Sequence, residues 1–239
     1  MKVLILGHKG MLGNAVYKYL NSKTDVITQH LSDSRWSSES FVRDILTFDG
    51  DYIINCIGAI PQRTDKFEVN YELPIWLDKN VKCKIIHPAT DCEMDNDDYG
   101  KSKSKAGIYL ESNGNNTKQI MTSIIGHELN SSNSLLDWFL NANGEVSGYS
   151  ECYWNGNTTL EWAKQSYDII INWDSYSKKT TIISECISKY ELLNIIKGVY
   201  NKNIIVNQDN NIKANKCLLG IERDSIEIQL KELREFYDN

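Results

Sequence analysis

The sequence predicts an α/β protein built on a doubly wound parallel sheet. Strand and helix patterns alternate from the first residues onward, and a glycine-rich turn joins the first strand to the first helix. The run 52–57 is apolar apart from Asn55, which is typical of a central strand covered on both faces. With 239 residues, of which 41% are hydrophobic and 24% charged, the chain suits a single domain over 1–239. We expect a nucleotide-binding core of about 1–145 and a small C-terminal lobe of about 146–239.

The elements follow from short apolar runs and from apolar residues that recur at helical spacing. The expected strands are Val3–Leu6, Asp25–Thr28, Tyr52–Cys56, Cys83–His87, Gln119–Ile124 and Thr180–Ser184. The expected helices are Met11–Asn21, Ser38–Phe48, Phe67–Lys79, Tyr99–Glu111, Ser134–Leu140, Thr159–Asn172, a capping-box helix from Ser188 to Tyr200, and Asp224–Tyr237. Residues 143–157 are rich in turn formers, so we expect only short, turn-rich segments there.

Three glycines, Gly7, Gly10 and Gly13, follow the first strand with the spacing G-x-x-G-x-x-G. Glycine permits a sharp turn and a close approach of a diphosphate to the backbone. The helix that begins there offers free N–H groups and the positive end of its dipole. The context of strand, glycines and helix predicts a dinucleotide site, and a tight turn that binds no ligand is the alternative.

A Y-x-x-x-K pattern, formed by Tyr99 and Lys103, places a phenol and an ammonium on one face of a helix. A cation beside the phenol is expected to lower the pKa of Tyr99 from about 10, so that the tyrosine could exchange a proton with a substrate oxygen. The neighbouring Lys101 and Lys105 leave open a simple solvated basic face. Upstream, Thr90 places a hydroxyl at the carboxyl end of a central strand, where open α/β sheets bind ligands.

In this order, the glycine turn, the strand-end hydroxyl and the Y-x-x-x-K pattern resemble the extended short-chain dehydrogenase/reductase superfamily. They resemble more closely its dTDP-4-dehydrorhamnose reductase group of sugar-nucleotide reductases. Segments 55–58, 69–74, 87–92, 122–129, 148–160, 187–193 and 215–219 also carry the resemblance. It implies a Rossmann-type NAD(P)-binding fold whose C-terminal lobe binds substrate. It also implies an NAD(P)H-dependent oxidoreductase that reduces the 4-keto group of a nucleotide-activated 6-deoxy sugar, in dTDP-rhamnose or other polysaccharide biosynthesis.

The resemblance assigns roles to residues at matching positions. Thr90 is expected to bond the substrate carbonyl, Tyr99 to donate the proton, and Lys103 to tune Tyr99 and hold the nicotinamide ribose. The expected cofactor-binding residues are Gly7, Lys9, Gly10, Met11, Leu12, Gly13, His30, Cys56, Ile57, Gly58, Tyr99, Lys103, Ser123, Ile124 and Ile125. The expected substrate-binding residues are Thr90, Asp91, His127, Tyr153 and Trp154. A capping or packing role stays open for His127, and a packing role for Tyr153 and Trp154.

The chain departs from the family pattern at three places. Ala89 stands where the family commonly has Ser, and residues 91–98 form a shorter connection than the family usually has. No acidic residue closes the second strand at His30, which together with Lys9 favours NADPH over NADH. The first two departures favour a second hypothesis, a catalytically weak or inactive nucleotide-binding regulatory subunit of the same fold.

Composition narrows the remaining function classes. The net charge of −6 and the pI of about 5.3 argue against nucleic-acid binding. No apolar run approaches the roughly 20 residues of a membrane span, and no secretory signal is seen, so we expect a cytoplasmic protein. The six cysteines are expected to be reduced, and no spacing of Cys, His or acidic residues indicates a metal site. The sequence leaves a homodimer open.

Overall fold

Alternating strands and helices form the first of two units into which the chain divides. The structure is a computed structural model that describes residues 1–31 and 35–238. Its first unit comprises Met1–Met121 and Ala163–Thr180, and its second Thr122–Trp162 and Thr181–Asn239. The chain thus passes into the second unit after Met121 and returns to the first from Ala163 to Thr180.

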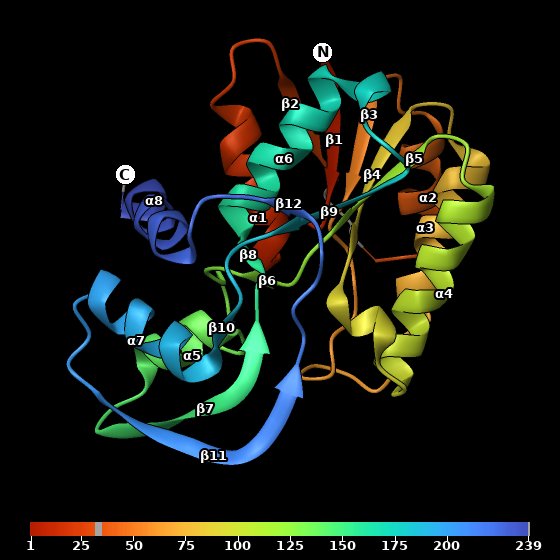
Figure 1. The fold of residues 1–239 in the computed structure, drawn as a ribbon. Helices are drawn as coiled ribbons and strands as arrows, with labels where there is room; N and C mark the ends of the chain where they lie inside the picture. The colour runs from red at the N-terminus through yellow and green to blue at the C-terminus, as the bar shows by residue number, and fades with distance from the viewer. Residues whose placement is uncertain (32–34, 239) are drawn as a thin grey trace. The chain divides into compact units, whose positions relative to one another are not determined.

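The first unit carries a parallel sheet with helices on both faces, which confirms the predicted fold class. Its elements are β1 (Lys2–Leu6), α1 (Met11–Asn21), β2 (Ile27–His30), α2 (Glu39–Leu46), β3 (Tyr52–Asn55), α3 (Val69–Asn80), β4 (Lys84–Ala89), the 3₁₀ helix η1 (Asp91–Met94), α4 (Asp98–Asn113), β5 (Thr117–Met121), α6 (Thr159–Ile171), η2 (Trp173–Ser175) and β9 (Lys179–Ile183). Both α6 and β9 run from one unit into the other. Helices α1 and α6 cover one face of the sheet, and α2, α3 and α4 cover the other (Figure 1).

The strand order explains where a ligand could bind in the first unit. The seven-stranded sheet runs β12-β9-β5-β4-β3-β1-β2, and the pairings from β2 through β5 are all parallel. The chain winds outward from β1 to β2 and then returns to place β3, β4 and β5 on the other side. Open α/β sheets bind ligands at such a reversal point, outside the carboxyl ends of the strands. Strand β3 is buried along its whole length, as its apolar run predicts.

The second unit contains strands that the sequence did not predict, two of them long. It holds β6 (Ile124–Ile125), α5 (Leu135–Asn141), β7 (Glu145–Trp154), β8 (Asn157–Thr158), β10 (Ile187–Ser188), α7 (Lys189–Val199), β11 (Ile205–Asn215), β12 (Ile221–Glu222) and α8 (Ile226–Asp238). Strand β7 lies between β10 and β11 in a three-stranded sheet. The expectation of short turns across 145–154 is wrong. Gly148 is not a turn residue there, since a Cβ on it would lie 2.8 Å from the Cα of Tyr190.

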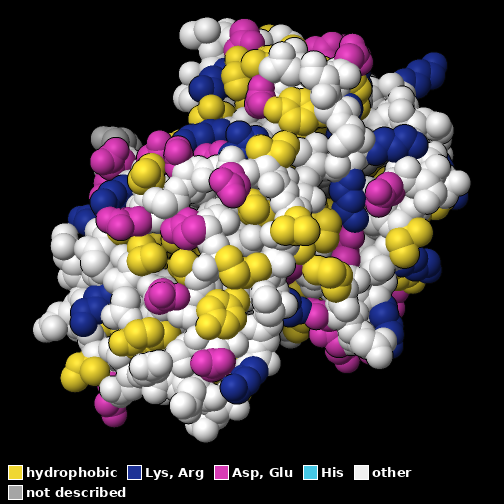
Figure 2. All heavy atoms as spheres, in the orientation of Figure 1, with side chains coloured by type: hydrophobic (Ala, Val, Ile, Leu, Met, Phe, Trp, Pro, Cys, Tyr) yellow, Lys and Arg dark blue, Asp and Glu magenta, His cyan; other side chains and the backbone are white. Residues whose placement is uncertain are grey.

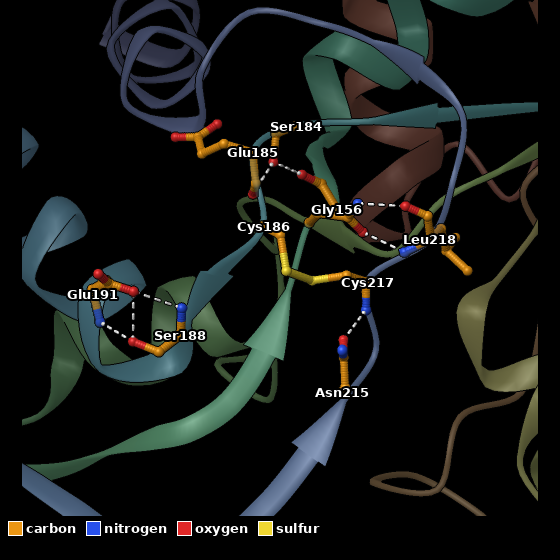
Figure 3. Close-up of a disulfide and its surroundings, with 10 residues drawn as sticks. Gly156, Ser184, Glu185, Cys186, Ser188, Glu191, Asn215, Cys217 and Leu218 are labelled. Carbon is orange, nitrogen blue, oxygen red and sulfur yellow. Dashed lines mark hydrogen bonds between the residues drawn. A yellow bond between two sulfur atoms is a disulfide. The ribbon is translucent and has the colours of Figure 1, made fainter.

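A disulfide between Cys186 and Cys217 corrects the expectation that all six cysteines are reduced. Their Cα atoms lie 5.9 Å apart, within the range that a disulfide requires. Strand β10 pairs with the end of β7 on one side and β11 pairs with it on the other, so the residues flanking these strands meet (Figure 3). Around the disulfide, Ser184 Oγ donates to Gly156 O at 2.7 Å and Asn155 holds Leu218 by two hydrogen bonds of 2.9 Å.

The surface gives no sign of a single-sign charged patch on the face shown in Figure 2, where acidic and basic side chains are interspersed. Within the described ranges, no helix is both long enough and apolar enough to span a bilayer.

Candidate active site

The glycine turn between β1 and α1 packs its backbone too closely for side chains. Gly7 has a φ of +77°, and its carbonyl accepts a hydrogen bond of 2.9 Å from the Gly10 amide. A Cβ on Gly13 would lie 2.1 Å from the Gly7 oxygen. Gly10 is the N-cap of α1 and has no side chain to accept from the first helical amides. The amides of this first turn, including those of Met11 and Leu12, are therefore available to an anion.

The glycine turn lies against the turn that follows β3. A Cβ on Gly7 would lie 3.0 Å from both the carbonyl carbon and the oxygen of Cys56. The structure thus brings the predicted cofactor residues of these two turns, including Ile57 and Gly58, to the reversal point of the sheet. Burial raises the pKa of the Cys56 thiol, so this cysteine stays neutral.

Asn70, on α3, is a residue whose role the sequence analysis missed. It is 1% exposed, and its side chain accepts from Ala59 N at 2.7 Å and donates to Ala59 O at 3.0 Å. It also donates to Ser102 Oγ at 3.1 Å, and Ser102 Oγ donates to the Tyr99 carbonyl at 2.6 Å. One buried amide therefore joins the turn after β3 to the start of α4. The one sign of this role in the sequence is an Asn on the apolar face of a predicted helix.

Thr90 ends β4 and caps η1. Its hydroxyl donates to Asp91 Oδ1 at 2.9 Å and accepts from Cys92 N at 3.3 Å, while Glu93 Oε1 accepts from Thr90 N at 3.3 Å. The short connection of residues 91–98 thus folds into a capped 3₁₀ turn that is followed directly by α4. Asp91 is 4% exposed. The Thr90 hydroxyl must leave Asp91 before it can donate to a substrate carbonyl.

Helix α4 carries the other two predicted catalytic residues. It begins after Asp97, whose Oδ1 accepts from Gly100 N at 2.6 Å. Lys103 is buried, and its Nζ donates to the Pro88 carbonyl of β4 at 3.1 Å. Burial lowers the pKa of Lys103, against the opposing effect of Glu93 and Cys92. The Tyr99 ring packs edge-on against Phe67, with ring centroids 5.7 Å apart.

The expectation that Lys103 lowers the pKa of Tyr99 is wrong. Burial raises this pKa, and the negative charges of Cys92, Asp91, Asp97 and Glu93 raise it further. The Lys103 ammonium is instead held on a backbone carbonyl. Helix α4 packs closely on η1, since a Cβ on Gly100, next to Tyr99, would lie 2.5 Å from the Cys92 carbonyl oxygen and one on Gly107 would lie 2.6 Å from Glu93 Oε2.

A buried histidine supports the site from within the sheet. His87 is 2% exposed, and burial followed by the charge of Lys103 lowers its pKa well below 6.5. Its Nδ1 lies 3.2 Å from Asn55 Nδ2, so Nδ1 accepts and the ring is neutral. Asn55 Oδ1 in turn accepts from Ile57 N at 3.1 Å, which positions the predicted cofactor turn after β3.

The second unit holds the remaining predicted site residues, and their roles stay predictions. The Ser123 carbonyl accepts from Asn157 N at 2.9 Å beside Ile124 and Ile125 of β6. Tyr153 is 38% exposed, whereas Trp154 is 2% exposed, as the packing interpretation has it.

His127, also in the second unit, has both ring nitrogens engaged. Nδ1 lies 2.8 Å from Asp137 Oδ1 and Nε2 lies 2.9 Å from the Tyr200 hydroxyl. A substrate could reach this ring only by replacing one of these two partners.

Two of the acidic residues between Thr90 and Tyr99 have structural roles. Glu93 pairs with Lys179 at 2.8 Å and Asp97 caps α4. Across residues 1–31 and 35–238, no group of three or more His, Cys, Asp or Glu side chains is placed to hold a metal ion.

Comparison with known proteins identifies the fold. No protein-family model matches the sequence, and no curated protein matches it either. Among solved structures, a dTDP-4-dehydrorhamnose reductase from Clostridium acetobutylicum superposes with a TM-score of 0.72 at 17% identity, over 100% of both chains. The dTDP-4-dehydrorhamnose reductase of Bacillus anthracis, solved with NADP, gives 0.72 at 14% identity, over 100% of this chain and 99% of that one.

A further solved structure shows that the fold is shared by more than one activity. The dTDP-glucose 4,6-dehydratase of Bacillus anthracis, solved with NAD, gives a TM-score of 0.71 at 14% identity over 100% of this chain and 96% of that one. The protein therefore has the fold that these reductases and this dehydratase share. The resemblance drawn from the sequence is confirmed at the level of the fold.

Proposed function

We propose that the protein is an NADPH-dependent reductase that converts the 4-keto group of a nucleotide-activated 6-deoxy sugar to an alcohol. The observation that carries the proposal is the arrangement of residues in the first unit. A glycine turn without covering side chains lies at the reversal point of the sheet. Thr90 ends β4, and Tyr99 and Lys103 lie on α4, the helix that follows β4 and η1. Reductases that act on such sugars share the fold over their full length, which supports the reaction class.

The residues of the first unit fit a dinucleotide. The close contact between Gly13 and the Gly7 carbonyl leaves the first amides of α1 uncovered by side chains, as a diphosphate requires. The residues that would hold it are the glycine turn, the Cys56–Gly58 turn and Lys103. A bound nicotinamide would supply the hydride to the sugar carbon.

The chain's own groups would handle the proton and the developing charge. The Tyr99 phenol, kept protonated by its raised pKa, would pass its proton to the oxygen that becomes the alcohol. The Thr90 hydroxyl, turned from Asp91, would donate to the same oxygen. Lys103 would release the Pro88 carbonyl and hold the ribose near Tyr99. One hydride and one proton convert the carbonyl to CH–OH.

The test is NADPH oxidation by the purified protein with a panel of 4-keto-6-deoxy sugars carried on dTDP, UDP, GDP or CDP. A Tyr99→Phe variant should keep the parent affinity for NADPH and lose about 10²–10⁴-fold in kcat, because only the transferable proton is removed. Tyr109→Phe, the same change on the same helix, is the matched control and should turn over at the parent rate. Parent activity in Tyr99→Phe would refute the assigned role.

A second candidate, a regulatory subunit with weak or no turnover, is favoured by one observation. The Thr90 hydroxyl already donates to Asp91 Oδ1 at 2.9 Å, so it is not aimed at a substrate carbonyl. A protein that binds NADPH and a sugar nucleotide but turns over no member of the panel would support this candidate against the first.

A further inference from the structure

Two imidazole rings stack beside the glycine turn. His8 directly follows Gly7, and His30 is the last residue of β2. Their ring centroids are 3.9 Å apart with an interplanar angle of 25°. Tyr17 of α1 lies against both rings, at 6.0 Å from His8 and 5.6 Å from His30. The sequence analysis singled out His30 and Lys9 but not His8, because only the fold brings the turn and the end of β2 together.

The charged side chains near this His8–His30 pair are Lys9, Asp44 and Asp49. Burial lowers the pKa of His8, and the charges of His30 and Lys9 lower it further. His30 Nδ1 lies 3.5 Å from the Leu31 carbonyl. Asp44 and Asp49 line the hollow beside His30. In the ranges that the structure describes, neither ring is ion-paired with a carboxylate.

Two protonated rings at this distance repel each other, so the pair resists taking up protons by itself. An anion placed against the pair offsets that repulsion, and its binding is then coupled to proton uptake. Lys9 adds a further positive charge beside His8. The first amides of α1 face the same turn, which is where the proposed function puts the diphosphate of the cofactor.

We propose that His8, His30 and Lys9 form a pH-dependent anion site for a phosphate monoester on the adenosine ribose, so that the preference for NADPH over NADH strengthens as pH falls. This inference rests on the proposed function and specifies how its cofactor is chosen. NADH has no phosphate at this position and would bind without proton uptake by the pair. Above about pH 6.5 the monoester is already mostly a dianion, so the change in preference there comes from the histidines.

The experiment measures the Kd of NADPH and of NADH by cofactor fluorescence between about pH 6.5 and 8.5 at constant low ionic strength. The loss of one charge-assisted hydrogen bond raises a Kd by about tenfold or more. We expect the ratio Kd(NADH)/Kd(NADPH) to fall by at least about tenfold across this range. Calorimetry in two buffers of different ionisation enthalpy should show proton uptake for NADPH and none for NADH.

Variants separate the titrating from the constant charge. The double variant His8→Gln/His30→Gln should flatten the ratio to within about twofold, whereas Lys9→Gln should weaken NADPH binding at every pH and leave the slope in place. A ratio Kd(NADH)/Kd(NADPH) that does not change with pH in the parent chain, or that changes equally in the double variant, overturns this inference. NADPH-dependent turnover would in that case still support the proposed function. If neither dinucleotide binds, the inference and the proposed function are both wrong.

Discussion

Gly13→Ala and Gly10→Ala, two substitutions in one turn, should have opposite consequences. A Cβ on Gly13 would lie 2.1 Å from the Gly7 oxygen, 2.7 Å from its carbonyl carbon and 3.0 Å from the His8 Cα, all of them backbone atoms. Overpacking costs about 1–3 kcal/mol, and contacts this short belong at the upper end. Alanine gains about 1 kcal/mol in helix propensity. The free energy of unfolding of Gly13→Ala should therefore fall by about 2 kcal/mol, or about 4–8 °C in Tm.

The Gly10→Ala variant should keep its stability and lose affinity for the dinucleotide. The added methyl would meet only the Gly7 oxygen, at 3.4 Å, which is an ordinary contact. Its free energy of unfolding should stay within about 1 kcal/mol of the parent value. The methyl would stand before the amides that a diphosphate needs, so NADPH affinity should drop about tenfold or more.

Thermal unfolding without ligand and fluorescence titration with NADPH measure the two effects separately. A parent Tm in Gly13→Ala would refute the close packing of the turn. Parent NADPH affinity in Gly10→Ala would refute the glycine turn as the cofactor site, whatever the stability data show.

Three further predictions concern single groups. Replacing both Cys186 and Cys217 by Ser should lower the free energy of unfolding by about 3–4 kcal/mol, because the disulfide joins residues 31 positions apart. Alkylation of the denatured, unreduced parent protein should label the four cysteines outside the disulfide. Labelling of all six cysteines would contradict the disulfide. The pKa of His87 is lowered in the folded protein, so below about pH 6.5 the unfolded chain binds a proton at this residue that the native state does not bind. The free energy of unfolding, measured with urea, should therefore fall from about pH 7 to pH 5. It should fall less in the His87→Asn variant. The raised pKa of Tyr99 keeps its phenol protonated, so the kcat for reduction should show no decrease caused by Tyr99 below about pH 10. A decrease of kcat near pH 8 in the parent protein that is absent from Tyr99→Phe would contradict this.

Features encoded within one strand–turn–helix segment could be predicted from the sequence. The glycine turn follows from spacing alone, because the strand, the turn and the helix are consecutive in the chain. The capping box of Ser188 and Glu191 forms as predicted, with Glu191 N donating to Ser188 Oγ at 3.1 Å. Each of these depends on neighbours no more than a few residues away.

Features that depend on partners distant in the chain could not be predicted. The length of β7 was missed because Gly148 serves the close approach of Tyr190, more than forty residues later. The disulfide depends on β10 and β11 pairing with opposite sides of the same strand. The clasp formed by Asn70 depends on Ser102 of another helix.

The Y-x-x-x-K pattern predicted the positions of Tyr99 and Lys103 on one helix but not the direction in which the pKa of Tyr99 is shifted. An i, i+4 spacing places Lys103 on the same helix face but does not set the distance between the ammonium and the phenol. Burial raises the pKa of Tyr99, and the acidic groups of the shortened connection after Thr90 raise it further, while Lys103 is held on the Pro88 carbonyl. An alcohol can be oxidised only by a phenolate acting as base, whereas a carbonyl is reduced by a phenol acting as acid. The short loop that departs from the family pattern therefore helps to keep Tyr99 protonated at neutral pH, which is the form that the proposed reduction requires.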